Sequence, residues 1–258
     1  MHVGMASGET LTVIVPVFDE EAAVLNAIER VLTNPAVTQV VVVDDASKDR
    51  TPERLDRLDS QAVPVTVVRH DRNRGKGAAI RTGLRYARGS FVVVQDADLE
   101  YDPSELPVLL AAARDGEGVC FGSRYLCAGE NAGRPLMDRC VAGLNGVVQL
   151  LYGVRLTDEA TCYKLMPTDL LRSLDLQSER FEFCPEVVAK LCRLGIPIRE
   201  VPIRCEPRSK HDGKKLRLTD GVAAVQTLWR YRRWNPPAGA RQIAERLRSS
   251  RLDCQLSE

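Results

Sequence analysis

Four short runs of apolar residues, each followed by a polar stretch, divide the N-terminal half of the chain. They cover residues 11–17, 37–43, 63–68 and 91–94 and are rich in valine. Unbroken runs of this kind, without the polar alternation of a half-exposed strand, are typical of parallel strands that are covered on both faces. We therefore predict four buried β-strands in this half.

The segments between these runs have the composition and spacing of α-helices. Asp19 is predicted to cap a first helix, a second begins at about Pro52, and Gly75-Lys76-Gly77 opens a third. Strands that alternate with helices form an α/β fold, which we predict to be a doubly wound, mostly parallel sheet with helices on both faces. Ligands of such sheets bind at the carboxyl ends of the strands.

The C-terminal half has longer helical segments. Helices are predicted at about 136–151 and 185–194, and a strand is predicted near 198–203. A last helix is predicted over residues 219–234, because apolar residues recur there at helical spacing and Asn235-Pro236-Pro237 then stops the pattern. Arginines are crowded at the end of this helix.

These elements predict one main domain with short additions at both ends. We expect residues 1–10 to be a disordered lead, 11–218 the α/β domain, 219–234 an amphipathic helix suited to a membrane interface, and 235–258 a flexible tail. One side of the amphipathic helix is predicted to carry Val222, Val225, Leu228 and Trp229.

Carboxylates follow the fourth apolar run, in the string Gln95-Asp96-Ala97-Asp98-Leu99-Glu100. Because successive side chains of a strand alternate between its two faces, Asp96, Asp98 and Glu100 are predicted to point the same way. Oxygen ligands of this kind suit Mg²⁺ or Mn²⁺, which completes its shell with phosphate oxygens. The alternative is a solvated acidic turn without a ligand.

Two further loops carry candidate chemistry. Asp44 begins the string 44–51 at the end of the second run, where a carboxylate can accept hydrogen bonds from a nucleobase edge or a ribose; the alternative is a capped turn. The string 73–77 can offer backbone N–H groups and the Lys76 ammonium to a pyrophosphate. The histidines are few, and His70 is expected to be a surface residue.

Composition limits the class of protein. With 258 residues, of which 44% are hydrophobic, the chain can form one well-packed domain. Its net charge of +1 gives no reason to expect nucleic acid as a partner, although Lys and Arg are concentrated between residues 204 and 233. No apolar run approaches the roughly 20 residues needed to span a bilayer. We therefore expect a cytoplasmic protein that meets a membrane only at its surface.

Five ordered strings resemble glycosyltransferase family 2, whose members have the GT-A fold. These strings are 16–20, 44–51, 73–77, 95–103 and 122–124. The later strings 158–164, 181–183 and 207–215 resemble the polyprenyl-phosphate (dolichyl-phosphate) sugar synthase branch of that family. The resemblance extends from about Leu11 to Trp234 and implies a GT-A fold for the domain at 11–218.

The resemblance also implies roles for individual residues. Binding of a nucleotide sugar is implied for Pro16, Phe18, Glu20, Asp44, Asp96, Arg208 and Lys214. Lys76 is expected to bind the same nucleotide sugar. A metal site is implied for Asp96, Asp98 and Glu100. Catalytic roles are implied for Asp98, Arg124, Arg139 and Asp158. The two arginines of this last group would hold the lipid phosphate, while Arg208 and Lys214 would belong to a loop that closes over the phosphates.

The implied reaction is the transfer of one sugar, with inversion, from GDP-mannose or a UDP-sugar to a polyprenyl or dolichyl phosphate at the cytoplasmic membrane face. A phosphate monoester has a second pKa of about 6, so it is already anionic at neutral pH and needs no general base. We expect contact with the membrane surface or with a small membrane-protein partner. One alternative is a family member that uses Asp158 or Glu159 as base for a hydroxyl acceptor; another is a noncatalytic nucleotide-binding subunit of a membrane complex.

Overall fold

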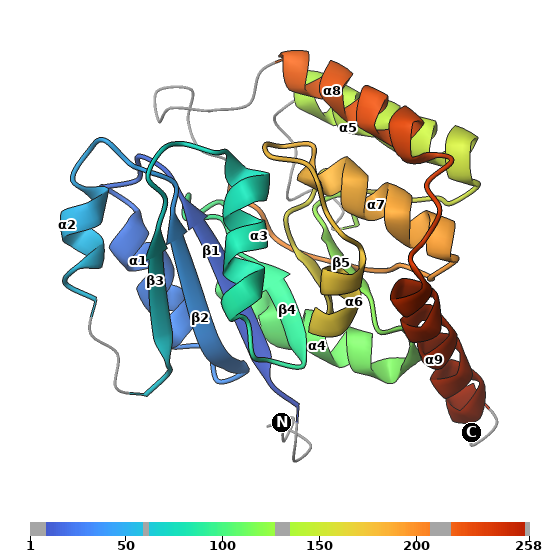
Figure 1. Cartoon of the computed structure of the whole chain (residues 1–258), viewed down its shortest axis with the longest axis horizontal. Coiled ribbons are helices and arrows are strands. Elements are labelled where there is room, and N and C mark those ends of the chain that lie inside the picture. Colours follow the sequence, from blue (N-terminus) through green and yellow to red (C-terminus); the bar gives the residue numbers. More distant parts are fainter. Residues whose placement is uncertain (1–8, 59–61, 127–134, 207–217, 256–258) are drawn as a thin grey trace.

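The centre of the molecule is a single β-sheet. A computed structural model of the chain (Figure 1) describes residues 9–58, 62–126, 135–206 and 218–255. The strands in these residues are β1 Leu11–Val17, β2 Val37–Asp44, β3 Val65–Arg69, β4 Phe91–Val94, β5 Cys120–Ser123, β6 Lys164–Pro167 and β7 Arg199–Pro202. In the described part of the chain they form one seven-stranded sheet in the order β3-β2-β1-β4-β6-β5-β7.

Most neighbouring strands of the sheet are parallel. β1 lies parallel to β2 and β4, and β2 to β3, while β6 runs antiparallel to β4 and β5. This confirms the predicted doubly wound, mostly parallel sheet. β5 and β6 were not predicted as strands, because neither contains the β-branched residues that favour a strand.

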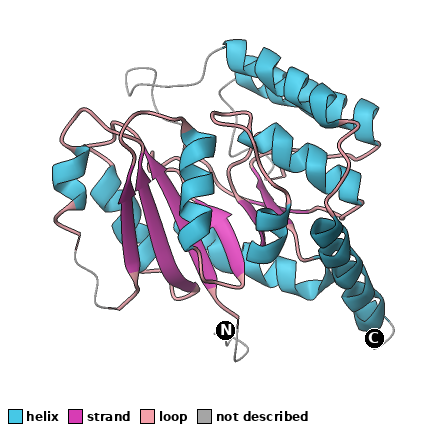
Figure 2. Ribbon diagram, viewed as in Figure 1, coloured by secondary structure: helices cyan, strands magenta, loops and turns pink. Residues whose placement is uncertain are grey.

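Helices cover both faces of the sheet (Figure 2). Their bounds are α1 Val24–Leu32, α2 Thr51–Leu55, α3 Lys76–Tyr86, α4 Leu106–Ala112, α5 Pro135–Tyr152, α6 Thr168–Ser173, α7 Phe183–Leu194, α8 Leu218–Tyr231 and α9 Ala238–Gln255. Alternate residues of β1 enter two separate cores. Ile14 packs with residues of α3, α6 and α7, whereas Val13 and Val15 pack with residues of α1 and α4. Both faces of the sheet are therefore buried, as the unbroken valine runs predicted.

The first helix is not capped by Asp19. α1 begins at Val24, and Ala23 precedes it without a side-chain cap. Asp19 instead adopts a positive φ of 50°, and its Oδ1 atom accepts a hydrogen bond from the backbone N–H of Lys48 at 2.7 Å. The carboxylate thus joins the loop after β1 to the loop after β2.

The predicted flexible tail is wrong for most of its length. Residues 238–255 form α9, which packs on α6 and α7. Its buried face consists of Ala240, Ile243, Ala244 and Leu247, at spacings i, i+3, i+4 and i+7. The two alanines are fully buried and allow close approach of the helix to its neighbours. Their low hydrophobicity made this face easy to overlook in a charged sequence.

α8 forms where the last amphipathic helix was predicted, but its apolar residues lie on two faces. Leu228 is fully buried, whereas Val222 and Trp229 are 60% and 55% exposed. α8 lies beside α5 and α7. Within the described residues, no helix combines the length and the apolar composition that a bilayer crossing requires.

The predicted disordered lead falls almost entirely outside the described residues. Its last residue, Thr10, is placed and exchanges hydrogen bonds with Ser90. Thr10 is therefore fixed beside the sheet.

Candidate active site

The loops that follow β1, β2 and β4 meet at one edge of the sheet. These three strands are adjacent and parallel, so their carboxyl ends lie together. The backbone N–H of Asp45 donates to the carbonyl of Val17 at 2.8 Å, and that of Gln95 donates to Ile14 at 2.9 Å. The fold thus brings three of the predicted motifs to the same edge, although they lie far apart in the sequence.

Four of the residues predicted to bind the nucleotide line the ends of β1 and β2. Pro16, Phe18 and Glu20 are half-buried at the end of β1. Asp44 is buried, and its carboxylate accepts the backbone N–H of Ser47 at 3.0 Å. Asp44 therefore stabilises the turn of its own loop, which agrees with the alternative prediction of a capped turn. A contact between Asp44 and a nucleotide stays a prediction.

The acidic motif after β4 is a turn and not a continuation of the strand. β4 ends at Val94, and Leu99 has a positive φ of 62°. The alternation that was expected to align three carboxylates therefore does not apply. Within the described residues, no group of three or more His, Cys, Asp or Glu side chains is arranged to hold a metal ion. The predicted ligand set of Asp96, Asp98 and Glu100 is thus not a preassembled site.

Two of these carboxylates nevertheless fit a divalent cation. Burial, together with the nearby carboxylates of Asp96 and Glu100, raises the pKa of Asp98 to about 7. A cation with oxygen ligands would relieve this crowding of negative charge. Mg²⁺ and Mn²⁺ are commonly held by one or two carboxylates and by the phosphates of a substrate. Asp96 and Asp98 are therefore suited to such an ion together with a bound diphosphate.

Lys76 contacts one of these carboxylates directly. Its Nζ atom lies 2.6 Å from Oδ1 and 2.8 Å from Oδ2 of Asp96. Burial alone would lower the pKa of Lys76, but the charge of Asp96 outweighs it and the pKa is raised. The lysine is therefore a permanent cation at this edge of the sheet.

The loop that carries Lys76 is fixed by a buried hydrogen-bond network. The Asp45 carboxylate accepts the backbone N–H groups of Arg74 at 2.8 Å and Gly75 at 2.7 Å. It also lies 2.7 Å from Nδ1 of His70, whose Nε2 lies 2.9 Å from the hydroxyl of Thr82. The His70 side chain is only 4% exposed, so the expectation of a surface residue is wrong. The sequence signal that was missed is the second aspartate of the Asp-Asp pair.

A neighbouring loop holds the other side of this segment. The backbone N–H of Gly77 donates to the carbonyl of Arg180 at 3.2 Å, and that of Ala78 donates to Glu179 at 3.0 Å. A Cβ atom on Gly75 would lie 2.4 Å from the Glu179 carbonyl oxygen. The glycines therefore permit close approach of two loops, and these amides already bond to the protein. The N–H groups of Arg74, Gly75 and Gly77 are therefore not available to a pyrophosphate, whereas the Lys76 side chain stays a candidate for that role.

Arg124 and Asp158 form a buried ion pair after β5. The guanidinium donates through Nε at 2.6 Å and through Nη2 at 2.7 Å to the two carboxylate oxygens. The Arg124 side chain is 15% exposed and that of Asp158 is fully buried. The rings of Tyr101 and Tyr125 each lie 5.8 Å from the guanidinium carbon. Asp158 therefore fixes the orientation of Arg124, and its carboxylate does not face solvent.

Glu159 is also closed off from solvent. It is 1% exposed, and its Oε1 atom is buried without a hydrogen-bond partner among the described groups. Burial raises its pKa to about 7. The Lys164 ammonium donates to the backbone carbonyl of Glu159 at 2.7 Å and not to its carboxylate. Neither of the two candidate bases is thus accessible to an acceptor in this conformation.

Three of the predicted site residues remain. Arg139 lies exposed on α5. Arg208 and Lys214 lie outside the described residues.

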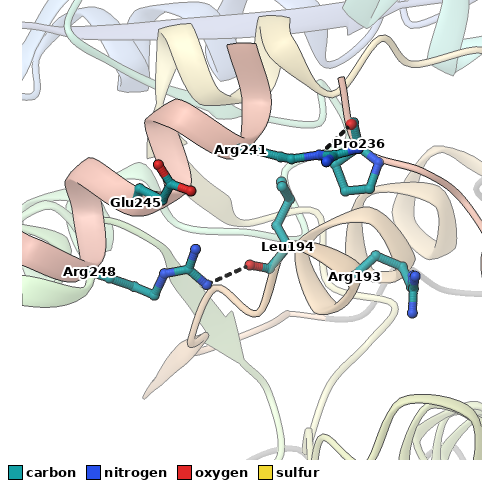
Figure 3. Close-up of a pocket in the computed structure, with 6 residues that line it drawn as sticks. All are labelled: Arg193, Leu194, Pro236, Arg241, Glu245 and Arg248. Carbon is teal, nitrogen blue, oxygen red and sulfur yellow. Dashed lines mark hydrogen bonds between the residues drawn. The ribbon is translucent and has the colours of Figure 1, made fainter. Parts of the chain in front are cut away.

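A cavity elsewhere in the molecule has no connection with these motifs (Figure 3). It has a volume of about 250 Å³ and lies between α7 and α9, lined by Arg193, Leu194, Pro236, Arg241, Glu245 and Arg248. Arg248 donates to the carbonyl of Leu194 at 3.1 Å, and Arg241 donates to that of Pro236 at 2.9 Å. Arg248 thus satisfies a carbonyl group at the C-terminal end of α7, and Arg241 satisfies one just before α9 begins. The cavity is therefore part of the junction that attaches α9.

Comparisons with known proteins bear on the fold and the family. The model of "Glycosyl transferase family 2" matches residues 12–173, which is more than half of the chain. Undecaprenyl-phosphate mannosyltransferase of Micrococcus luteus is 30% identical over 224 residues, which are 84% of this chain and 92% of the relative. Dolichol-phosphate mannosyltransferase of Pyrococcus furiosus is 28% identical over 215 residues, which are 80% of this chain but only 60% of the relative.

Solved structures show the same fold. Glucosyl-3-phosphoglycerate synthase of Mycobacterium tuberculosis, in complex with Mn²⁺, UDP and glucosyl-3-phosphoglycerate, matches 90% of this chain and 82% of its own, with a TM-score of 0.62 and 21% identity. S. aureus TarS in complex with UDP-GlcNAc matches 96% of this chain and 73% of its own, with a TM-score of 0.60 and 16% identity. These likenesses confirm the expected GT-A fold.

Proposed function

Since the chain belongs to glycosyl transferase family 2 and is a glycosyltransferase, we propose that it transfers one sugar from a nucleoside-diphosphate sugar to a polyprenyl phosphate. The names of the Micrococcus and Pyrococcus relatives support this acceptor. The donor is GDP-mannose or a UDP-sugar, and the anomeric carbon is inverted by direct attack of the acceptor.

The observation that carries the proposal is the state of the two candidate bases. A hydroxyl acceptor needs a base within reach of its proton. Asp158 is engaged by Arg124, and Glu159 is buried. A phosphate acceptor is already anionic at neutral pH and needs only to be held and oriented. The site is thus better suited to a lipid phosphate than to a sugar hydroxyl.

On the donor side, Asp96 and Asp98 would hold Mg²⁺ or Mn²⁺. The ion would offset the negative charge that develops on the departing nucleoside diphosphate. The Lys76 ammonium, 2.6 Å from Asp96, would add a second positive charge beside the departing diphosphate. Pro16, Phe18, Glu20 and Asp44 would contact the nucleoside, and Arg208 and Lys214 would close over its phosphates.

On the acceptor side, Arg124 and Arg139 would bind the lipid phosphate. Arg124 is preoriented by Asp158 through two hydrogen bonds. A guanidinium held in this way loses little conformational freedom when it binds a phosphate. Asp158 is in this proposal a positioning residue and not a base.

The surface formed by α5 and α8 would meet the membrane. The two helices lie side by side (Figure 1). Leu150 of α5 is 83% exposed, and Val222 and Trp229 of α8 are also exposed. The guanidinium carbon of Arg232 lies 3.7 Å from the centroid of the Trp229 ring. Exposed apolar side chains beside cations suit a bilayer surface with anionic lipids. We infer peripheral attachment at the cytoplasmic face.

The test is transfer of labelled sugar by the purified protein. GDP-mannose, UDP-glucose and UDP-N-acetylglucosamine are each supplied with Mg²⁺ or Mn²⁺ and with polyprenyl phosphate in vesicles. Free polyprenol and a soluble sugar acceptor serve as controls. One donor is expected to label the polyprenyl phosphate alone, and Asp98→Ala is expected to abolish that transfer. Arg85→Met, an exposed charge removal on α3, is expected to keep it.

Two other results would contradict the proposal. Labelling of the soluble sugar alone would indicate a hydroxyl acceptor. Binding of nucleotide without any transfer would indicate a noncatalytic subunit. Flotation with vesicles tests the membrane surface separately: Trp229→Glu is expected to reduce it, and unchanged flotation would favour attachment through a membrane-protein partner.

A further inference from the structure

The Lys76 ammonium is bound to the Asp96 carboxylate, which a metal ion at this site would need as a ligand. The ammonium lies within 2.8 Å of both oxygens of Asp96. A divalent cation that binds Asp96 would have to share these oxygens with a positive charge at nearly the same place. Because like charges at such a distance repel strongly where water is scarce, the ammonium and the metal cannot both keep Asp96.

The backbone of Lys76 is fixed, whereas its ammonium is able to move. The preceding residue Gly75 is held by Asp45, and the following residue Gly77 is held by Arg180. A lysine carries its charge on a flexible four-carbon stem. The Lys76 side chain is 19% exposed, so one side of it is open to a ligand. The ammonium can therefore exchange Asp96 for another anion without movement of the backbone.

We propose that Lys76 is an internal counter-ion that competes with the divalent metal for Asp96 until the donor diphosphate draws the ammonium away. The proposal rests on the proposed function, which places the metal at Asp96 and Asp98. Without the diphosphate, the ammonium neutralises Asp96 and metal binding is weak. When the diphosphate binds, the ammonium moves to a phosphate oxygen and Asp96 becomes available. The metal and the donor thus bind cooperatively, each favouring the other.

The first measurement is the affinity for Mn²⁺ alone, by electron paramagnetic resonance of the free ion or by calorimetry. Lys76→Met is expected to bind Mn²⁺ about tenfold more tightly than the unchanged protein. Lys76→Gln, which keeps a hydrogen-bond donor for Asp96 but not the charge, is expected to change in the same direction. Arg85→Met removes a charge from the last turn of the same helix and is expected to leave Mn²⁺ affinity unchanged.

The second measurement is the affinity for GDP or UDP without any metal. Lys76→Met is expected to weaken it by about tenfold, because the ammonium is the proposed diphosphate contact. Tighter Mn²⁺ binding together with weaker diphosphate binding is a pattern that a damaged fold would not produce, since damage would weaken both. Adding Asp96→Asn to Lys76→Met is expected to remove the gain in Mn²⁺ affinity.

The proposal is overturned if both neutral variants bind Mn²⁺ as weakly as the unchanged protein, or more weakly, while their thermal unfolding shows that they are folded. Neither measurement uses an acceptor. If the protein labels no lipid, the competition between Lys76 and Mn²⁺ for Asp96 can still be observed. If it transfers sugar normally, that competition can still be absent. The proposed function and the proposed role of Lys76 can therefore fail independently.

Discussion

Glu159 gives the sharpest test of how the acidic residues near Arg124 work. Its side chain is almost completely buried, and burial raises its pKa from the ordinary 4.5 to about 7. In the folded protein the carboxyl is therefore protonated at pH values where it is ionised in the unfolded chain. Glu159→Gln replaces it by a neutral group of nearly the same shape, which cannot ionise.

The size and the sign of the effect follow from this difference in pKa. Between pH 4.5 and about 7 the folded state holds one more proton at Glu159 than the unfolded state does. The free energy of unfolding therefore falls as pH rises through this interval and is level above it. A pKa difference of this size changes the free energy of unfolding by at most about 3 kcal/mol. Glu159→Gln is expected to remove this part of the pH dependence, so that its stability relative to the unchanged protein rises from pH 5 to pH 8.

The measurement is urea unfolding at pH 5, 6, 7 and 8. Any constant cost of a buried amide cancels when the pH slopes of the two proteins are compared. Glu53→Gln, at an exposed position of α2, is the control and is expected to keep the slope of the unchanged protein. Sugar transfer is expected to survive Glu159→Gln. Equal slopes for Glu159→Gln and the unchanged protein would refute the argument from burial, and loss of transfer in a folded variant would point to Glu159 as the base.

Four other substitutions test individual packing contacts of the fold. Gly75→Ala places a Cβ atom 2.4 Å from a backbone oxygen at a φ of +92° and is expected to lower the thermal unfolding midpoint strongly. Gly146→Ala, which meets nothing within 4 Å, is expected to raise it slightly. Lys190→Met leaves the buried carboxylate of Glu186 without its cation, 2.6 Å away, and is expected to cost about 3–5 kcal/mol in urea unfolding. Ala244→Arg puts a charge into the buried face of α9 and is expected to expose this helix to hydrogen exchange and proteolysis.

The half of the fold with continuous valine runs could be predicted from sequence, because burial on both faces leaves a direct signal. The predicted strand at 91–94 coincides with β4, and that at 11–17 coincides with β1. β6 left no such signal, since Lys164–Pro167 pairs antiparallel with its neighbours and contains a charged residue. The charge is tolerated because the Lys164 ammonium bonds to backbone carbonyls. Pairing of this kind depends on tertiary contacts that a local pattern does not show.

α9 could have been predicted from its spacing. Ala240, Ile243, Ala244 and Leu247 recur as they do on one face of a helix. The surrounding charges suggested a solvated tail instead, because a mean over the segment hides a narrow apolar face. A small buried face contributes little to average hydrophobicity but is enough to attach a helix to a larger core.

At the site, the sequence identified the chemical groups but not their relations. The acidic motif and the loop of Lys76 were both recognised, yet nothing local indicated that Lys76 would contact Asp96. The expected common orientation of Asp96, Asp98 and Glu100 was wrong because periodicity was extended beyond Val94, where the strand ends. Alternation of faces holds only as long as the backbone stays extended.

The position of the Lys76 ammonium results from contacts with three separate parts of the chain. Asp45 fixes the amide of Gly75, and the Arg180 carbonyl fixes that of Gly77. Asp96 then receives the ammonium itself. The first two contacts hold backbone and the third holds only the end of a flexible side chain, so a ligand can break the third without disturbing the others. A fixed backbone with one mobile charge is the arrangement that an exchange between carboxylate and diphosphate requires. The amides on either side of Lys76 are held by protein groups, whereas its ammonium can leave Asp96 for a phosphate oxygen.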